Sequence, residues 1–165
     1  MSKASDPYDL HRFVRAQDPV FEQVCAELRE GQKRGHWMWF IFPQLRGLGH
    51  SDMSVKFGIS SEEEARAYLE HPALGPRLRK CSCLVNRLEG VSIKKIFVHP
   101  DDLKFRSSMT LFATIRSTSD KTDFENALQK YFAGKPDRVT ILRLRRFRLE
   151  TAADPPLLAI DEPAE

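Results

Sequence analysis

The sequence predicts an all-α fold: a compact, multihelical single domain of short helices followed by a disordered C-terminal tail. Apolar residues recur at helical spacing, Pro and Gly interrupt the pattern at short intervals, and no succession of strands or internal repeat is visible. These breaks imply about eight to ten short helices instead of a long bundle. We expect the domain over residues 6–150 and the tail, which is Pro-rich and acidic, over residues 151–165.

The composition is that of an ordinary soluble domain. Of the 165 residues, 41% are hydrophobic and 30% are charged, which excludes collagen-like, mucin-like and wholly disordered chains. The longest apolar run, residues 37–43, is far shorter than the ~20 residues needed to span a bilayer. The N-terminus also lacks the apolar stretch of a secretory signal. We therefore expect a cytoplasmic protein with no membrane association.

Capping residues mark where the helices begin. Asp6 precedes Pro7 at the start of the first amphipathic stretch, and Asp18-Pro19 repeats this signal before a helix that Gly31 ends. Further caps are predicted at Ser51, Ser61, Ser92, Asp101, Asp102, Asp123 and Asp137. In chain order, the predicted helices span about residues 7–16, 19–30, 51–57, 61–69, 76–88, 92–97, 103–116 and 124–132, with a last one from 138.

Two segments leave the type of element open. Residues 35–44 are apolar on every face and carry both tryptophans, so we expect them at the centre of the core, as a short helix or a strand. Residues 142–149 partly alternate, so a strand remains an alternative to a helix there. Cys25 and Cys81 are expected to be small buried apolar side chains, because an odd cysteine count does not suggest a disulfide framework.

Four stretches, residues 6–14, 33–44, 68–78 and 101–112, together resemble the DUF1810 family, a domain of unknown function. The resemblance covers about residues 6–134 in unbroken order and fades beyond Gly134. It implies a compact, all-helical single domain and supplies no reaction. Family members sometimes carry a calpastatin-like label, but calpastatin-type inhibitors are disordered chains, whereas this sequence has the pattern of a packed domain.

The aromatic segment is the first candidate for a binding site. Trp37 and Trp39 with His36 can stack on flat ligands, and Gln44 can hydrogen-bond a base edge or an amide. The alternative is that the two indoles are core and that His36 is a satisfied polar group. Lys33 and Arg34, which come just before this segment, can add positive charge, or can simply be cations at the end of a helix.

A second candidate lies in the helix predicted from residue 103 to 116. Arg106 and Thr110 are four residues apart and share a face, with Ser107 beside them and Lys104 three residues before Ser107. Ammonium, guanidinium and hydroxyl groups on one face suit a phosphate or carboxylate, although a solvated basic face is the alternative. The hydroxyl groups favour the binding interpretation, because Ser and Thr are weak helix formers.

These candidates give two hypotheses. The first is a pocket for a small anionic, ring-containing ligand such as a nucleotide, with His36 as the best acid–base group if the protein is an enzyme. No cofactor or metal is expected, because the sequence lacks a Walker A loop, a G-x-G-x-x-G motif and a His-Glu-x-x-His motif. The second is a non-catalytic module that docks on a protein or RNA through an Arg-rich segment comprising Arg143, Arg145, Arg146 and Arg148.

Overall fold

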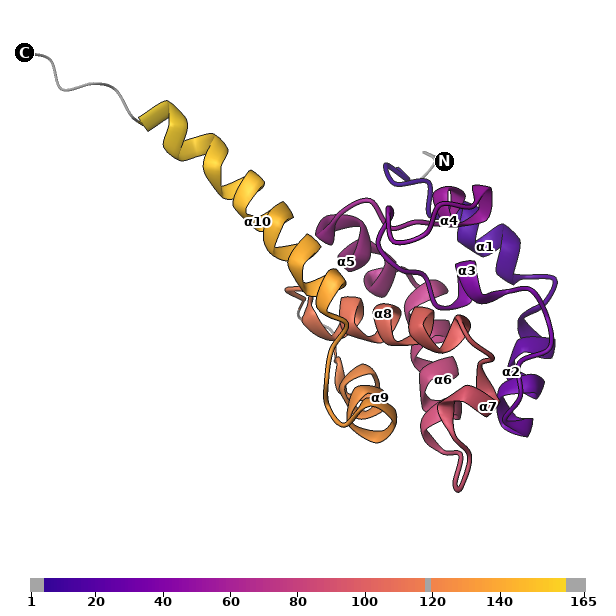
Figure 1. Cartoon of the computed structure of the whole chain (residues 1–165). Helices are drawn as coiled ribbons and strands as arrows, with labels where there is room; N and C mark the ends of the chain where they lie inside the picture. Colours follow the sequence, from indigo (N-terminus) through magenta and orange to yellow (C-terminus); the bar gives the residue numbers. More distant parts are fainter. Residues whose placement is uncertain (1–4, 118–119, 160–165) are drawn as a thin grey trace, which may run out of the picture.

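The structure, a computed structural model, describes residues 5–117 and 120–159, and of residues 151–159 it describes the helical backbone alone. The described residues form ten α-helices without a β-strand, which confirms the all-α prediction (Figure 1). In chain order these are α1 His11–Gln17, α2 Phe21–Glu30, α3 Met38–Ile41, α4 Asp52–Lys56, α5 Glu62–Glu70, α6 Leu74–Asn86, α7 Ile93–Ile96, α8 Asp101–Thr114, α9 Thr122–Phe132 and α10 Arg138–Ala159.

Most of the predicted helix caps are confirmed. The hydroxyl groups of Ser51, Ser61 and Ser92 each accept a hydrogen bond from the backbone N–H three residues later. The carboxylate of Asp137 does the same for Thr140 at the start of α10. At the end of α2, Gly31 has a φ of 80°, the left-handed conformation that glycine adopts most readily. Local sequence therefore determines where these helices begin and end.

The predicted caps are wrong at the starts of α8 and α9, and Asp18 does not cap α2, which follows Val20 and has no side-chain cap. α8 begins at Asp101, so Asp101 and Asp102 lie within its first turn, where their charges still favour the helix dipole but cap nothing. α9 begins one residue before the predicted cap Asp123. Asp120 accepts hydrogen bonds from the backbone N–H and the hydroxyl of Thr122 instead. The errors at α8 and α9 arise because a short run of polar residues offers several equivalent starting points for one helix.

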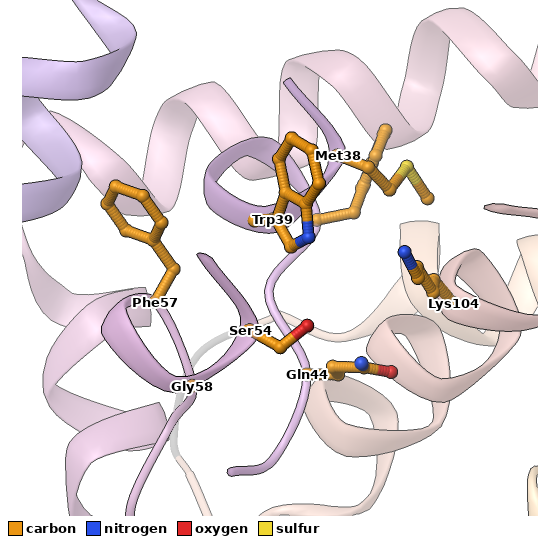
Figure 2. A pocket seen from close by; sticks show the side chains of 8 residues that line it. Met38, Trp39, Gln44, Ser54, Phe57, Gly58 and Lys104 are labelled. Atoms are coloured by element: carbon orange, nitrogen blue, oxygen red, sulfur yellow. The ribbon is translucent and has the colours of Figure 1, made fainter. Parts of the chain in front are cut away.

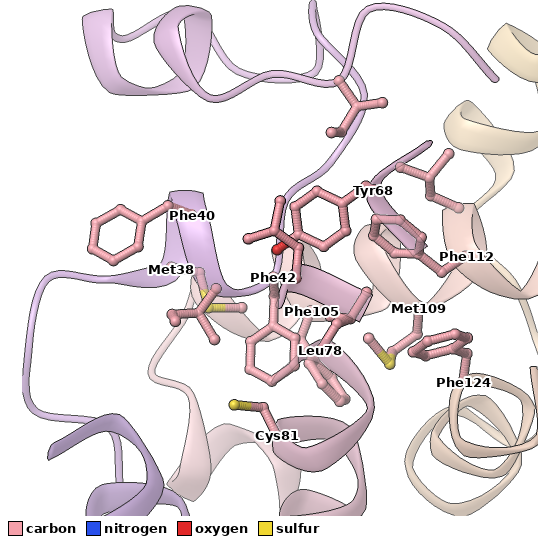
Figure 3. Packing of buried hydrophobic residues seen from close by; sticks show 14 of the residues in the cluster. Met38, Phe40, Phe42, Tyr68, Leu78, Cys81, Phe105, Met109, Phe112 and Phe124 are labelled. Carbon is pink, nitrogen blue, oxygen red and sulfur yellow. The ribbon is translucent and has the colours of Figure 1, made fainter. Parts of the chain in front are cut away.

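The aromatic segment lies at the centre of the core, as predicted, and of the two elements considered for it the structure has a short helix, α3. Trp37, Phe40 and Phe42 are buried, and the ring of Phe42 stands edge-on to that of Phe105 at 5.0 Å between centroids (Figure 3). Trp39 is the exception, because it is only partly buried. One indole of the segment therefore belongs to the core and the other reaches the surface.

α8 lies across the middle of the molecule, and α5, α7, α9 and α10 pack against it (Figure 1). Its predicted inner line of Phe105, Met109 and Phe112 is fully buried (Figure 3). Cys25 on α2 and Cys81 on α6 are buried free thiols, again as predicted. The other faces of α8 contact neighbouring helices or solvent.

α10 is helical throughout residues 142–149, so the strand alternative is wrong. Its first half packs on α8 through the fully buried Leu144, and the rest projects away from the body of the molecule (Figure 1). The helix continues to Ala159, into the segment predicted as a tail, and residues 160–165 of that tail lie outside the described residues. Packing on α8 explains the helix, because it buries one side of an otherwise ambiguous pattern.

Candidate functional site

A small hollow lies between α3, α4 and the start of α8 (Figure 2). It has a volume of only about 10 Å³ and is open to solvent. Its walls are mostly apolar, and its polar groups come from residues far apart in the sequence. The lining residues are Met38, Trp39, Phe42, Gln44, Ser54, Phe57, Gly58 and Lys104.

The polar groups of this hollow face one another. Figure 2 shows the indole nitrogen of Trp39, the hydroxyl of Ser54, the amide of Gln44 and the ammonium of Lys104 directed toward the same space. The Lys104 Nζ lies 5.5 Å from the centroid of the Trp39 ring. The Trp39 indole N–H and the Lys104 ammonium are donors only. The hollow therefore suits a group that is rich in acceptors or carries a negative charge.

A second, wider hollow adjoins the first one, and Gln44 and Lys104 line both. It has a volume of about 300 Å³ and is more open to solvent than the first. It also brings in the hydroxyl of Ser107 and the carboxylate of Asp137. Lys104 and Ser107 reach the same space because they lie three residues apart on α8. The two hollows together form one groove, which we call the Trp39–Asp137 groove.

Asp101 connects two cations beside this groove. Its carboxylate lies 2.9 Å from the Lys33 Nζ and 3.6 Å from the Lys104 Nζ. Lys33 is the better paired of the two, and it also lies 5.2 Å from the centroid of the Trp37 ring. Two ammonium groups share the Asp101 carboxylate. Lys104 keeps hydrogen-bonding capacity for a ligand.

Backbone pairing positions Gln44 in the groove. Its carbonyl accepts a hydrogen bond from the Ile59 N–H at 2.9 Å, next to the isolated parallel bridge between Leu45 and Ile59. Gly58 permits this pairing, because a Cβ there would come within 2.8 Å of the Arg46 backbone. A Cβ at Gly49 would come within 2.5 Å of the Ser54 hydroxyl oxygen, so any side chain at position 49 would displace that hydroxyl.

Four residues that the sequence suggested do not line the groove: Lys33, Arg34, His36 and Trp37. Trp37 is buried, and its indole N–H donates to the Glu27 carboxylate at 3.2 Å. Arg34 points outward and pairs with Glu30. His36 is exposed and lines neither hollow, so the structure gives it no partner for acid–base chemistry there. The physical reason is the short helix α3, which turns Trp39 toward the groove while Trp37 precedes it on the buried side.

Arg106 and Thr110 also lie elsewhere than the sequence suggested. The Arg106 guanidinium donates to the carbonyl of Lys135 at 3.0 Å and stacks on the Phe132 ring. The Thr110 hydroxyl accepts from the Asp137 N–H at 2.8 Å. Both side chains thus attach the α9–α10 connection to α8. Lys104 and Ser107 lie on a different face of α8, so the predicted cluster divides into two groups with different partners.

The four arginines of the Arg-rich segment also have different partners. The Arg148 guanidinium donates two hydrogen bonds to the Glu62 carboxylate, at 3.0 and 3.1 Å, and ties α10 to α5. Arg146 pairs with Glu150, and Arg143 donates to the carbonyl of Gly47. Arg145 is exposed. The four guanidinium groups therefore do not form one continuous basic surface.

The groove contains residues that sequence analysis missed. Ser54, Phe57 and Gly58 reach it only because the segment after α4 returns beside Gln44. Asp137 was assigned a capping role, which it has, but its place in the groove gave no signal in the sequence. A periodic sequence pattern does not indicate which residues far apart in the chain become neighbours in the fold.

Glu27 holds the segment before α3 in place through its carboxylate, and replacing it should lower the stability of the protein. Burial works to raise the pKa of Glu27, but hydrogen bonds from the backbone N–H groups of Gly35 and Arg34 outweigh it, so the pKa lies below 4.5. We expect Glu27→Gln to lower the free energy of unfolding by about 1–3 kcal/mol at pH 7. The exposed Glu30→Gln variant, the matched control, should differ little from the wild type.

The loss of unfolding free energy in Glu27→Gln should become smaller at low pH. A carboxylate whose pKa is lowered by folding stabilises the protein above its unfolded pKa, and this contribution disappears as the pH falls through the folded value. The difference between the wild type and Glu27→Gln should therefore shrink as the pH falls below 4.5. Urea denaturation between pH 7 and pH 3 measures it. A difference that stays constant over this range would show that the charge of Glu27 is not responsible.

Two further findings concern the described residues as a whole. Every helix in this part of the chain is too short or too polar to cross a membrane. No group of three or more His, Cys, Asp or Glu side chains within it is arranged to hold a metal ion.

Comparison with known proteins identifies the family. The model of the DUF1810 family, described as "Protein of unknown function", matches residues 7–144, ten residues beyond the expected limit at Gly134. No curated protein matches the chain. A crystal structure of the conserved hypothetical protein Rv1873 from Mycobacterium tuberculosis is similar, with 58% sequence identity and a TM-score of 0.82, over 85% of this chain and 99% of that one. The chain therefore belongs to the DUF1810 family.

Proposed function

We propose that the Trp39–Asp137 groove binds a small anionic, ring-containing ligand of the nucleotide kind, in the cytoplasm. The observation that carries the proposal is the convergence of Trp39, Gln44 and Lys104 on one space (Figure 2). Among the described residues, the indole N–H of Trp39 and the side-chain amide of Gln44 have no hydrogen-bond partner. Partly exposed polar groups without protein partners are free to bind a ligand.

The dimensions of the groove divide the ligand into two parts. The narrow hollow, at about 10 Å³, is far smaller than the range of roughly 300–1,000 Å³ typical of ligand pockets, so it has space for a water-sized group only. Only the edge of a ligand, next to Trp39 and Lys104, would enter it. The wider hollow beyond Gln44 has space for the remainder. A ligand that bridges the two would contact Gln44 along its length.

A binding screen tests the proposal. Thermal melting against a panel of nucleotides and sugar phosphates should show stabilisation by at least one compound, about 2.7 kcal/mol at a hundredfold excess over its Kd. A panel without any shift at millimolar concentrations would refute the proposal.

Lys104→Met is expected to weaken binding of the stabilising compound by roughly tenfold to a hundredfold, because a charge-assisted hydrogen bond is lost. The melting temperature without ligand should stay nearly constant, since Lys104 is only loosely paired with Asp101 at 3.6 Å. Isothermal titration measures the change. Lys94→Met, at an exposed lysine on α7 outside the groove, is the matched control and should bind like the wild type. Equal binding by both variants would show that Lys104 does not hold the anion.

The projecting helix α10 favours a second candidate function, a protein-interaction module. Val139 and Leu142 are each about half exposed on it, next to Arg143 and Arg146. An exposed face that combines apolar and basic side chains suits an acidic protein surface. Replacing Arg143, Arg145 and Arg146 by Glu should then abolish capture of a partner in a pull-down. Retention of every partner, or loss of bound RNA alone, would contradict this candidate.

A further inference from the structure

Asp137 lines the wide hollow of the groove and carries a carboxylate with one unused oxygen. One of its oxygens, Oδ2, accepts from the N–H and the hydroxyl of Thr140, at 2.9 and 2.6 Å. Among the described residues, no donor reaches the other oxygen, Oδ1. Asp137 lines the same wide hollow as Lys104 and Ser107. One carboxylate oxygen is therefore free to accept a hydrogen bond from a ligand.

α8 fixes the position of this carboxylate. The Asp137 N–H donates to the Thr110 hydroxyl at 2.8 Å, and that hydroxyl donates to the carbonyl of Arg106 at 2.8 Å. The Arg106 side chain in turn holds the carbonyl of Lys135 two residues earlier. With the bonds to Thr140, Asp137 is held from both sides. A carboxylate held in this way needs little ordering when it binds a ligand.

Donors and acceptors line different parts of the groove. Trp39 lines only the narrow hollow and offers a donor, and Lys104, which also offers donors only, lines both hollows. In the wide hollow the Ser107 hydroxyl gives its proton to the carbonyl of Leu103 at 3.1 Å, so it keeps only its acceptor capacity for a ligand. The Asp137 carboxylate beside it also accepts. Gln44, which lines both hollows, offers both kinds of group.

We propose that the groove selects ligands with two different ends: a phosphate or carboxylate held by Lys104, and hydroxyl or amino groups that donate to Asp137. This inference rests on the proposed function and narrows its ligand to hydroxyl-bearing phosphates, such as nucleotides and sugar phosphates. An anion that lacks donors meets the Asp137 charge without any compensating hydrogen bond, so the same residue excludes it.

Asp137→Asn tests the inference, because the Asn oxygen can cap the helix as Oδ2 of Asp137 does, while its NH2 group replaces the charged acceptor Oδ1 by a neutral donor. The probes are AMP and ribose 5-phosphate, which carry hydroxyl donors, and phenyl phosphate, which carries none at pH 8. Titration calorimetry should show affinity for the better-binding hydroxyl-bearing probe falling about tenfold in the variant, because the hydrogen bond to the charged acceptor is lost. Affinity for phenyl phosphate should rise by about twofold to fivefold as repulsion is removed.

Opposite changes for the two kinds of probe cannot come from partial unfolding, which would weaken both. If Asp137→Asn weakens both kinds of probe equally, or changes neither, the inference is wrong while binding at Lys104 still stands. If the wild type binds none of the three probes, the proposed function fails for this ligand class and the inference fails with it. Lys104→Met should weaken all probes that bind, and this result separates the anion-holding role of Lys104 from the selective role of Asp137.

Discussion

Replacing Arg12 by Met is expected to lower the free energy of unfolding by about 3–5 kcal/mol, because the substitution leaves a buried carboxylate without its partner. The Arg12 guanidinium lies 2.8 Å from the Glu64 carboxylate, and both side chains are more than nine-tenths buried. It also donates to the carbonyls of Lys56 and Gly58, at 2.8 and 3.1 Å. Arg12 thereby joins α1, α5 and the segment after α4 that supplies Phe57 and Gly58 to the groove.

Urea denaturation at neutral pH measures this loss. The matched control is Arg15→Met, at an exposed position three residues later on the same helix. It should change the free energy of unfolding by less than about 0.5 kcal/mol. The double variant Arg12→Met with Glu64→Met should be more stable than Arg12→Met alone, since it removes the unpaired charge. A double variant that loses the full sum of both single effects would show that the ion pair is not the cause.

Phe105→Ala is expected to cost about 3–5 kcal/mol, the range observed when a buried aromatic ring is removed and a cavity remains. The ring is fully buried, and its centroid lies 5.0 Å from that of Phe42 and 4.9 Å from that of Phe97. It therefore joins α8 to the aromatic segment and to the end of α7 in one cluster (Figure 3).

Thermal and urea unfolding check the prediction. Phe105→Leu, which keeps much of the volume, should lose clearly less than Phe105→Ala, because the cavity is smaller. Leu103→Ala, at a half-exposed position on the same helix, should have little effect on stability. A large loss in Leu103→Ala would contradict the prediction, because Ala is at least as good a helix former as Leu and the loss would then not be specific to the buried position.

The groove shows how much of a candidate site local sequence patterns can predict. Trp39, Gln44, Lys104 and Ser107 were singled out in the sequence as binding candidates, and the structure places them around one groove. Their residue types suggested chemistry, and helical spacing related Lys104 to Ser107. Neither observation could relate α8 to the aromatic segment, because that proximity depends on how the helices pack.

The predicted binding residues that do not line the groove show the same limit of sequence patterns. The spacing of Arg106 and Thr110 placed them together on one face of α8, but it did not reveal that the α9–α10 connection covers that face. Trp37 and Trp39 are nearly adjacent in sequence, and only the direction of α3 buries the first and leaves the second accessible. A side chain that looks available for a ligand in the sequence is thus often occupied by the protein itself.

The sequence by itself determined the all-α class, most of the helix starts and the composition of the core, because caps, breakers and apolar spacing act over a few residues. The tertiary structure decided which cations are paired, which indole lines the groove, and that Asp137 and Lys104 line the same hollow. The physical reason is range: these relations depend on contacts between residues about 33 to 100 positions apart, which are set by the packing of α8 against its neighbours and leave no periodic trace in the chain.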